Sequence, residues 1–194
     1  MAFSDSFTPE AGSSTYTMSN LKSGDSVKIR FLTEVTSGYS LWGEEDGEVK
    51  VYRAKTEEEI DKSKAGYYRG KKNKVKQFIV AIVWNYTSGQ FEVFETDKAQ
   101  IIKKLWTMDQ DQDLGDLRKY DIKVSKTGTG METRYEALPL GASKLADDIK
   151  RQFSELSYNL ENVFNDENPI SGAKSSSEDD FDVDEIADEM EAGF

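Results

Sequence analysis

The chain has no cysteine and no histidine among its 194 residues. A disulfide framework is therefore impossible, which fits a reducing compartment. Zinc sites made of Cys or His are excluded, as is catalysis by Ser–His or Cys–His pairs. The sequence predicts no metal and no cofactor.

Long apolar runs are also missing, and none approaches the roughly 18 residues of a membrane-spanning helix. The first residues, MAFSDSFTPEAGSS, lack the basic and apolar regions of a secretory signal. We therefore expect a cytoplasmic protein that is not secreted and does not bind a membrane.

Basic residues are in deficit, with 25 Lys and Arg against 37 Asp and Glu and a net charge of −12. The acidic excess is uneven. Residues 175–194 hold nine acidic residues and no basic one, which leaves 28 acidic against 25 basic residues elsewhere. The body of the protein is thus near neutral, and the difference in charge between regions says more about partners than the total does.

Short alternating segments dominate residues 21–141. In SVKIRFLTEV, the apolar residues Val27, Ile29 and Phe31 alternate with Lys28 and Arg30, which predicts a half-buried strand with a basic outer face. Further strands are expected near residues 39–42, 48–54, 75–86, 90–96, 120–126 and 131–138.

One helix is expected among these strands, over residues 96–108. Thr96 is its expected N-cap, and Ile101, Leu105 and Trp106 form an apolar face that we expect in the core. Several strands, a helix and two further strands indicate a mainly β, OB-type Greek-key barrel with an inserted helix. A small α+β sandwich is the competing fold.

Four other segments flank or interrupt the predicted barrel. Residues 1–20 are predicted to be a mobile arm with a short ordered piece around Tyr16. Residues 55–76 form a polar insertion. A stripe from Leu145 to Val163 predicts an amphipathic helix over residues 142–168, which could dock on the barrel or support self-association. Residues 169–194 are predicted to be a disordered acidic tail.

The insertion begins acidic and then turns basic. From Lys62 to Lys76 it has seven Lys or Arg and no acidic residue. Such a run is usually a solvated loop, but two adjacent tyrosines within it favour a binding surface. Cations for the phosphates and rings for the bases are what a sequence-independent single-strand binder needs. The predicted DNA contacts in this insertion are Tyr67, Tyr68, Arg69, Lys71, Lys72, Lys74 and Lys76.

Strand residues that point outward add further candidates, because an OB fold binds nucleic acid on its outward face. Each of them alone could be an ordinary surface residue, and Trp84 could be core, since it continues the period-two pattern of Phe78 and Val80. The predicted contacts of this set are Lys28, Arg30, Tyr39, Trp42, Tyr52, Arg53, Trp84 and Tyr86.

The acidic tail suggests two roles. Its carboxylates resemble a tethered polyanion that a basic groove would attract at high effective concentration. Its terminal Phe194 carries a ring and a carboxylate, which suit an apolar pocket rimmed by Lys or Arg on a partner protein. The alternative is a device for solubility. The predicted partner-binding residues of the tail are Asp179, Asp180, Phe181, Asp184, Glu185, Asp188, Glu189 and Phe194.

Three blocks, VKIRFLTEVTSGYSLW, FIVAIVWNYTSGQFEVFETDKAQIIKKL and LGDLRKYDIKVSKTGTGMETRYEALPL, give the chain a family resemblance. In this order they resemble the phage single-stranded DNA-binding proteins related to the helix-destabilising protein of T-even phages. The resemblance covers roughly residues 20–145. It implies an OB fold that coats single strands in replication, recombination and repair, in the cytoplasm of the infected bacterial host.

The resemblance also implies that the tail recruits replication and recombination proteins, such as a polymerase, a helicase or primase, or a recombinase. One departure concerns the insertion. T-even members carry a Cys/His zinc module there, whereas TEEEIDKSKAGYYRGKKNK cannot bind zinc in that way. The role of the insertion is therefore not implied by the resemblance.

Two rival functions remain. The first is an enzyme with a metal site at Asp109, Asp111, Asp113 and Asp116, although their spacing lacks the glycine and terminal glutamate of an EF-hand. The second is a protein-interaction module of a phage replication complex that does not bind DNA directly.

Overall fold

The computed structural model describes residues 16–18, 21–68 and 70–170. Its main feature is a seven-stranded antiparallel sheet, so the expected mainly β fold is confirmed. The predictions for residues 1–15, for Arg69 and for tail residues 171–194 lie outside this description. The strands of the sheet are β1 (Ser26–Phe31), β2 (Thr36–Glu45), β3 (Glu48–Ala54), β6 (Lys76–Asn85), β7 (Gln90–Thr96), β8 (Tyr120–Thr127) and β9 (Arg134–Ala142).

β1 and β2 run along the same neighbour. Residues 29–31 of β1 pair with residues 83–85 of β6, and residues 36–40 of β2 pair with residues 76–80. The strand order is β3-β2-β6-β1-β8-β9, with β7 on the other edge of β6. Among these strands β7 pairs only with β6 and β9 only with β8, so the sheet does not close into a barrel.

The helix α1 (Ala99–Gln110) packs on one face of the sheet. Its residues Ile101, Leu105 and Met108 are buried against Phe31 and Phe94 of the sheet. The expected N-cap was wrong: the helix begins after Lys98, and Thr96 instead accepts a hydrogen bond from the Lys98 amide at 3.1 Å.

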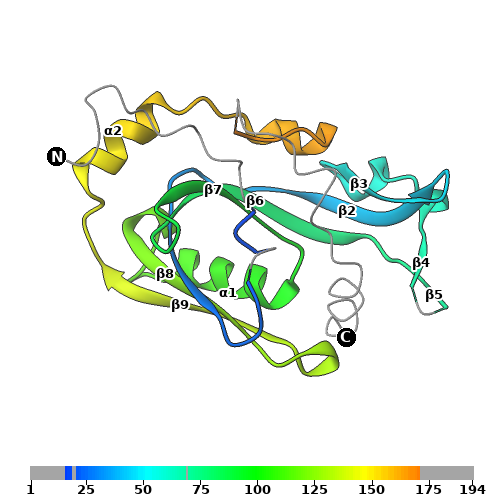
Figure 1. The fold of residues 1–194 in the computed structure, drawn as a ribbon, viewed down its shortest axis with the longest axis horizontal. Helices are drawn as coiled ribbons and strands as arrows, with labels where there is room; N and C mark the ends of the chain where they lie inside the picture. Colours follow the sequence, from blue (N-terminus) through cyan, green and yellow to red (C-terminus); the bar gives the residue numbers. More distant parts are fainter. Residues whose placement is uncertain (1–15, 19–20, 69, 171–194) are drawn as a thin grey trace, which may run out of the picture.

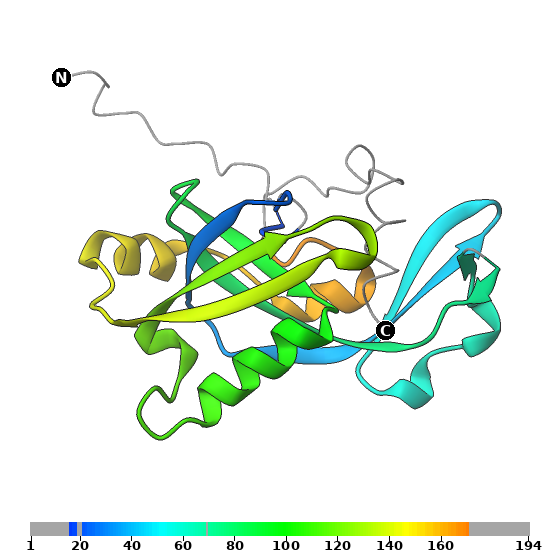
Figure 2. The same ribbon diagram turned by 90° about the horizontal axis from the view of Figure 1, so that it is seen from below.

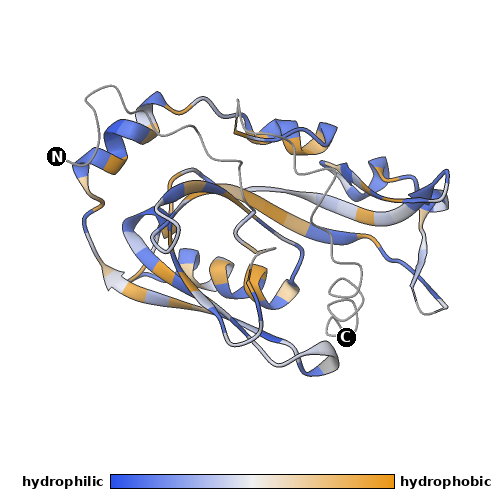
Figure 3. Ribbon diagram, viewed as in Figure 1, coloured by the Kyte–Doolittle hydropathy of each residue, from blue (hydrophilic) through white to orange (hydrophobic). Residues whose placement is uncertain are grey.

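The opposite face is covered by residues 147–170, which we call the cap segment. It consists of α2 (Asp147–Glu155), an extended stretch and the 3-10 helix η5 (Leu160–Asn165). Val163 and Ile170 are buried with Val80 and Ile82 of β6. In Figures 1 and 2 the cap segment and α1 lie on opposite sides of the sheet, and Figure 3 shows the apolar middle of β6 between them.

The prediction of one continuous helix over residues 142–168 was therefore wrong. The helix stops at Glu155, and the chain is extended up to Asn159, whose side chain accepts a hydrogen bond from the Glu161 amide and starts a new turn. Tyr158 then forms a bridge with Ile170. The apolar stripe is real, but it follows the surface of the sheet rather than one helix axis.

The insertion folds onto the far end of the β2–β3 hairpin, and together they form what we call the insertion lobe. It contains η1 (Glu57–Glu59), η2 (Lys62–Lys64), β4 (Tyr67–Tyr68) and β5 (Lys71–Lys72). Its small core is built from Leu41, Ile60 and Ala65. Gly43 permits the fold, because a side chain there would collide with the Lys64 carbonyl. Figure 2 shows the lobe extending away from the rest of the sheet.

The expected ordered piece around Tyr16 is confirmed. Tyr16 forms a parallel bridge with Val93 of β7, and the Thr17 hydroxyl donates a hydrogen bond of 2.7 Å to the buried Glu92 carboxylate. Burial, and next the nearby charge of Glu95, raise the pKa of Tyr16 to about 12. The tyrosine therefore stays neutral while it packs on the same face as the cap segment.

Candidate nucleic-acid interface

The hairpin at the end of the insertion lobe presents a ring beside a cation. β4 and β5 are antiparallel, with Tyr67 opposite Lys72 and Tyr68 opposite Lys71. Residues directly opposite each other share a face, with Cβ atoms about 5 Å apart. Tyr67 is 72% exposed and Lys72 is exposed, whereas Tyr68 is half-buried. One face of the hairpin therefore offers a flat apolar surface next to a positive charge.

Several other cations of the lobe already have acidic partners. Lys62 pairs with Glu57 at 2.7 Å and Lys64 pairs with Glu45 at 3.2 Å. Lys76 lies 3.7 Å from Asp97. Exposed pairs of this kind contribute little free energy and are easily exchanged for a phosphate.

Tyr39 and Tyr52 do not lie on the outward surface predicted for contacts with DNA. Both pack against the lobe core around Leu41. The ring of Tyr52 is also approached by the ammonium groups of Lys50 at 5.7 Å and Lys64 at 4.7 Å. The prediction that Tyr52 is an outward contact is thus corrected, because the lobe folds over this face of the β2–β3 hairpin.

Trp42 is half-buried in β2, on the strand face opposite Leu41. Its carbonyl accepts hydrogen bonds from the Gly66 amide at 3.1 Å and from the Asn73 side chain at 2.9 Å. The residue therefore ties β2 to both sides of the β4–β5 hairpin, and its place in the lobe keeps it a candidate for base contact.

Arg30 is not an exposed cation, which corrects the prediction of a basic outer face on β1. It is 2% exposed and pairs with the buried carboxylate of Asp121 at 2.5 Å. It also donates to the Ser143 carbonyl at 3.1 Å. The physical reason is that the chain leaving β9 crosses this face and covers the guanidinium.

Lys28 precedes Arg30 by two residues, on the same side of β1, and is half-exposed. Its ammonium group pairs with the same carboxylate, at 2.7 Å from an oxygen of Asp121. Its ammonium also lies over the Tyr86 ring at 4.3 Å, and the Tyr86 hydroxyl donates to Asp121 at 3.0 Å. Burial would raise the pKa of Asp121, but the hydrogen bonds from Lys28 and Tyr86 and the charge of Arg30 outweigh it and lower that pKa. These residues form a network that stabilises the fold, and only their exposed parts are a candidate surface for DNA.

Arg53 is also neutralised, so its predicted role as an outward cation is corrected. Its guanidinium pairs with Glu95 at 2.9 Å and with Asp166 of the cap segment at 2.7 Å. Burial raises the pKa of Glu95, although the charge of Arg53 opposes this rise. Arg53 therefore joins β3, β7 and the cap segment.

Trp84 is half-buried in β6, on the sheet face that the cap segment covers. Its ring meets Phe91 of β7 at 5.0 Å between centroids, Phe91 meets Phe153 at 5.9 Å, and Phe153 stacks on Tyr158 at 5.4 Å. Only Tyr158 at the end of this row is exposed, at 40%. The outer face of β6 and β7 is thus occupied by the protein's own rings.

Sequence reasoning missed a groove beside α1, because it placed Trp106 in the core. Trp106 is 64% exposed and lines a groove of about 1300 Å³. The groove lies between α1, residues 33–37, the start of β6, residues 116–118 and the start of β9. Its cationic lining residues are Lys76, Lys98, Lys103 and Arg118. We call this feature the α1 groove.

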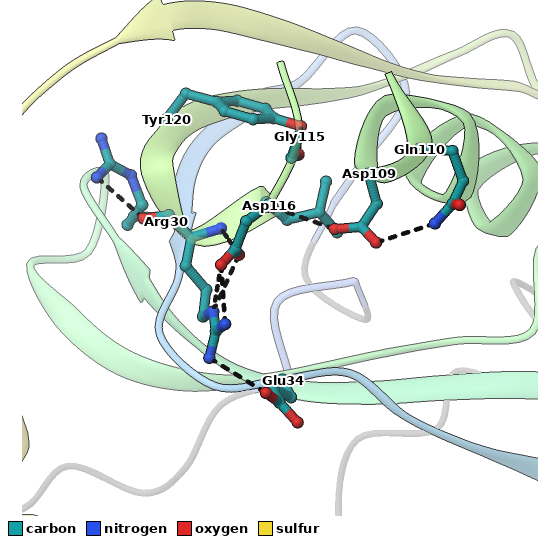
Figure 4. A network of polar contacts seen from close by, with 9 residues as sticks. Arg30, Glu34, Asp109, Gln110, Gly115, Asp116 and Tyr120 are labelled. Atoms are coloured by element: carbon teal, nitrogen blue, oxygen red, sulfur yellow. Dashed lines mark hydrogen bonds and ion pairs between the residues drawn. The ribbon is translucent and has the colours of Figure 1, made fainter. Parts of the chain in front are cut away.

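One end of the α1 groove is held by a polar network, shown in Figure 4. Arg118 donates two hydrogen bonds to the Asp116 carboxylate, at 2.9 and 2.8 Å, and lies 3.6 Å from Glu34. The hydrogen bonds from Arg118 lower the pKa of Asp116, although burial opposes this. Asp109 accepts from the Leu117 amide at 3.4 Å.

The aspartates that the enzyme alternative proposes as metal ligands include one that stabilises a turn of the backbone. Asp111 accepts hydrogen bonds from the amides of Asp113 and Leu114, at 2.8 and 3.1 Å. Within the described ranges, no group of three or more acidic side chains is placed to hold a metal ion.

Comparison with known proteins gives no family assignment. The chain matches no family model, and it has no significant match among curated proteins. Within the part of the chain that the structure describes, no helix has the length and apolar character needed to cross a bilayer.

Two surface features combine exposed rings with cations. The lobe hairpin offers an exposed ring and lysines, and the α1 groove offers a second exposed ring with cations around it. Rings stack on unpaired bases and lysines attract phosphates, so both features suit a flexible anionic chain with exposed bases.

Proposed function

We propose that the protein binds single-stranded DNA without sequence preference, coats and protects it, and acts in phage replication, recombination and repair. The observation that carries the proposal is the hairpin face on which Tyr67, 72% exposed, stands opposite Lys72. Stacking on a ring tolerates every base, and contacts with phosphate carry no sequence information. No metal, cofactor or catalytic group is required.

The strand order supports an OB-type architecture. If β1 and β2 are counted as one bent strand, and β3 is counted with the first connection, the order is long strand, β6, β7, α1, β8 and β9, with the helix between the third and fourth strands. OB folds are partly open barrels that bind through the face of strands two and three and through the adjoining loops. In this numbering the insertion lobe belongs to the first loop.

The cap segment covers one of these two surfaces, which supports the other as the binding surface. Strands two and three correspond to β6 and β7, whose outer face is buried under Val163 and Ile170. This leaves the first loop, which is the insertion lobe, as the main surface for the strand. The DNA is therefore expected to run over the insertion lobe rather than over the outer face of β6 and β7.

The tail enters the proposal through its chemistry alone. Nine carboxylates and a terminal Phe194 suit the recruitment of replication and recombination proteins, in the cytoplasm of an infected host. The second candidate function is an interaction module that does not bind DNA. The cap segment favours it in part, since it already shows how an amphipathic segment docks on this sheet.

A variant series of the hairpin tests the proposal. Tyr67→Ala removes an exposed ring, and we expect the loss of one stacked base to weaken binding of an oligothymidylate by about 1–3 kcal/mol. Lys71→Ala, Lys72→Ala and Lys74→Ala together should lower the log–log slope of affinity against salt by roughly 0.7 per lost phosphate contact. Fluorescence anisotropy at several salt concentrations measures both.

The matched control for Tyr67 is Tyr158→Ala, which removes the exposed ring at the end of the cap row. It should leave the affinity unchanged. An unchanged slope in the triple lysine variant, with unchanged affinity in Tyr67→Ala, would mean that the hairpin is a solvated loop and that the interaction-module function is preferred.

A further inference from the structure

Trp106 stands out because a tryptophan exposed to 64% on a helix has no role in the core. Its neighbours on α1 divide cleanly. Ile101, Leu105 and Met108 are buried against the sheet, whereas Lys103, three residues before Trp106 and therefore on the same side of the helix, is exposed and lines the groove with it. A large exposed ring next to a lysine suits a base and its phosphate.

The α1 groove gives this ring a setting. Ile79 and Leu105 form part of its apolar wall, and Tyr135 of β9 supplies a second ring. The ammonium groups of Lys98 and Lys126 lie 6.0 and 5.9 Å from the centre of the Tyr135 ring. The groove thus combines two aromatic rings with cations over a length set by α1, about 18 Å for twelve residues.

The charges of the groove are partly satisfied and partly free. Asp97 lies 3.7 Å from Lys76 and 3.4 Å from Lys98, and Asp116 and Glu34 pair with Arg118. Lys103 has no ion-pair partner among the described residues. A phosphate would therefore meet a free ammonium group beside Trp106 and loosely paired ones at the entrance.

The groove also begins where the basic insertion ends. Lys76 is the last cation of the run that starts at Lys62, and it is at the same time a lining residue of the groove. Lys98, at the N-terminus of α1, comes next to it through their shared partner Asp97. Lys76 thus belongs both to the basic insertion and to the groove that holds Trp106, although the groove lining also includes the acidic residues Glu34, Asp97, Asp109 and Asp116.

We propose that the α1 groove continues the single-strand path from the insertion lobe, with a base stacked on Trp106 and a phosphate on Lys103. The proposal rests on the proposed function and adds a second binding segment to it. The protein then holds a strand at two places on the α1 side of the sheet, while the cap segment occupies the other side.

The test compares variants on an oligothymidylate of about 20 nucleotides, longer than the roughly 4–16 nucleotides that one OB fold covers. Trp106→Ala should weaken binding about 5- to 150-fold, the equivalent of one stacked base. Lys103→Ala should lower the salt slope by roughly 0.7. Lys104→Ala is its matched control on the same helix, because Lys104 does not line the groove, and it should leave the slope unchanged. In Trp106→Phe, part of the fluorescence quenching caused by the oligonucleotide should disappear.

Further matched controls lie on the cap side. Tyr158→Ala removes an exposed ring, and Lys144→Ala with Lys150→Ala removes two exposed lysines that pair with Asp147. These variants should bind as the unaltered protein does. Urea unfolding should give the same midpoint for Trp106→Ala, since its side chain is exposed.

The possible failures are distinguishable. If the unaltered protein does not bind the oligonucleotide, the proposed function and the groove proposal both fall. If it binds, and the hairpin lysine variant is weakened while the Trp106 and Lys103 variants are not, the groove proposal alone is overturned. Loss of a protein partner without loss of DNA affinity in Trp106→Ala would assign the groove to protein docking instead.

Discussion

At the scale of single residues, a cation on the outward side of a strand can be structural. Lys28 and Arg30 stand two residues apart on the same strand, yet only Arg30 is buried. Alternation correctly predicted the side of the strand for both. It could not predict that Ser143, more than a hundred residues later, would cover Arg30, since that contact depends on where the chain goes after β9.

Asp121→Asn tests this structural reading. The change leaves the buried guanidinium of Arg30 without its counterion, and breaking a buried pair costs about 3–5 kcal/mol. Urea unfolding at neutral pH should show a loss of that order, whereas Lys28→Ala should cost less than about 1 kcal/mol because Lys28 is half-exposed.

The pH dependence follows from the lowered pKa of Asp121. A carboxyl whose pKa is lower in the folded protein stabilises it above the unfolded value, near 3.9, and this contribution is lost as pH falls through the folded value. The difference in stability between the unaltered protein and Asp121→Asn should therefore shrink below about pH 4. A difference that is constant down to pH 2 would contradict the ion-pair account.

At the scale of elements, periodicity predicted the long strands and α1 but not their partners. The sequence predicts a strand near residues 75–86, and this strand, β6, pairs with β1, β2 and β7. In contrast, the apolar positions of residues 145–163 fit a single helix and an interrupted helix equally well. The segment is interrupted because it follows the surface of a twisted sheet, and the shape of that surface cannot be read from the segment's own residues.

On α1, periodicity also failed to predict the environment of Trp106. Its spacing from Ile102 is one helical turn, which favours the core, yet both residues line the α1 groove instead. A helix has more positions with apolar spacing than a single sheet face can cover. Which of them remains exposed depends on the tilt of the helix, and the sequence does not report it.

The contribution of the cap segment to stability can be tested by the same substitution, Val to Ala, at one buried site in the segment and at one exposed site elsewhere. Val163→Ala removes two methyl groups from a side chain that is 1% exposed, and we expect it to cost about 2 kcal/mol. Val49→Ala is the matched control, since Val49 is 67% exposed and its loss should change stability by less than about 0.5 kcal/mol. Equal midpoints for both variants in urea would mean that the cap segment is not part of the cooperative fold.

At the scale of the whole molecule, the net charge of −12 conceals a nearly neutral body and an acidic tail. Deletion of residues 175–194 should strengthen binding to single-stranded DNA, most at low salt. The tail carboxylates and the DNA phosphates seek the same cations, and deletion also lowers the long-range repulsion of DNA. Anisotropy titrations at two salt concentrations measure the change, and unchanged affinity at low salt would exclude the competition.

Deletion of Phe194 alone separates the two roles of the tail. It keeps all nine acidic side chains, so DNA affinity should stay the same, while binding to replication or recombination proteins should be lost. Retention of every partner would leave the tail as a device for solubility.

The measurement that tests the central claim most directly is a paired titration of single-stranded and duplex DNA of the same mixed sequence, at two salt concentrations. Bases that are paired and stacked within a duplex cannot stack on Tyr67, whereas those of a single strand can. The account predicts tight binding to the single strand, weakened by salt, and much weaker binding to the duplex. Equal affinity for both forms at moderate salt would contradict it.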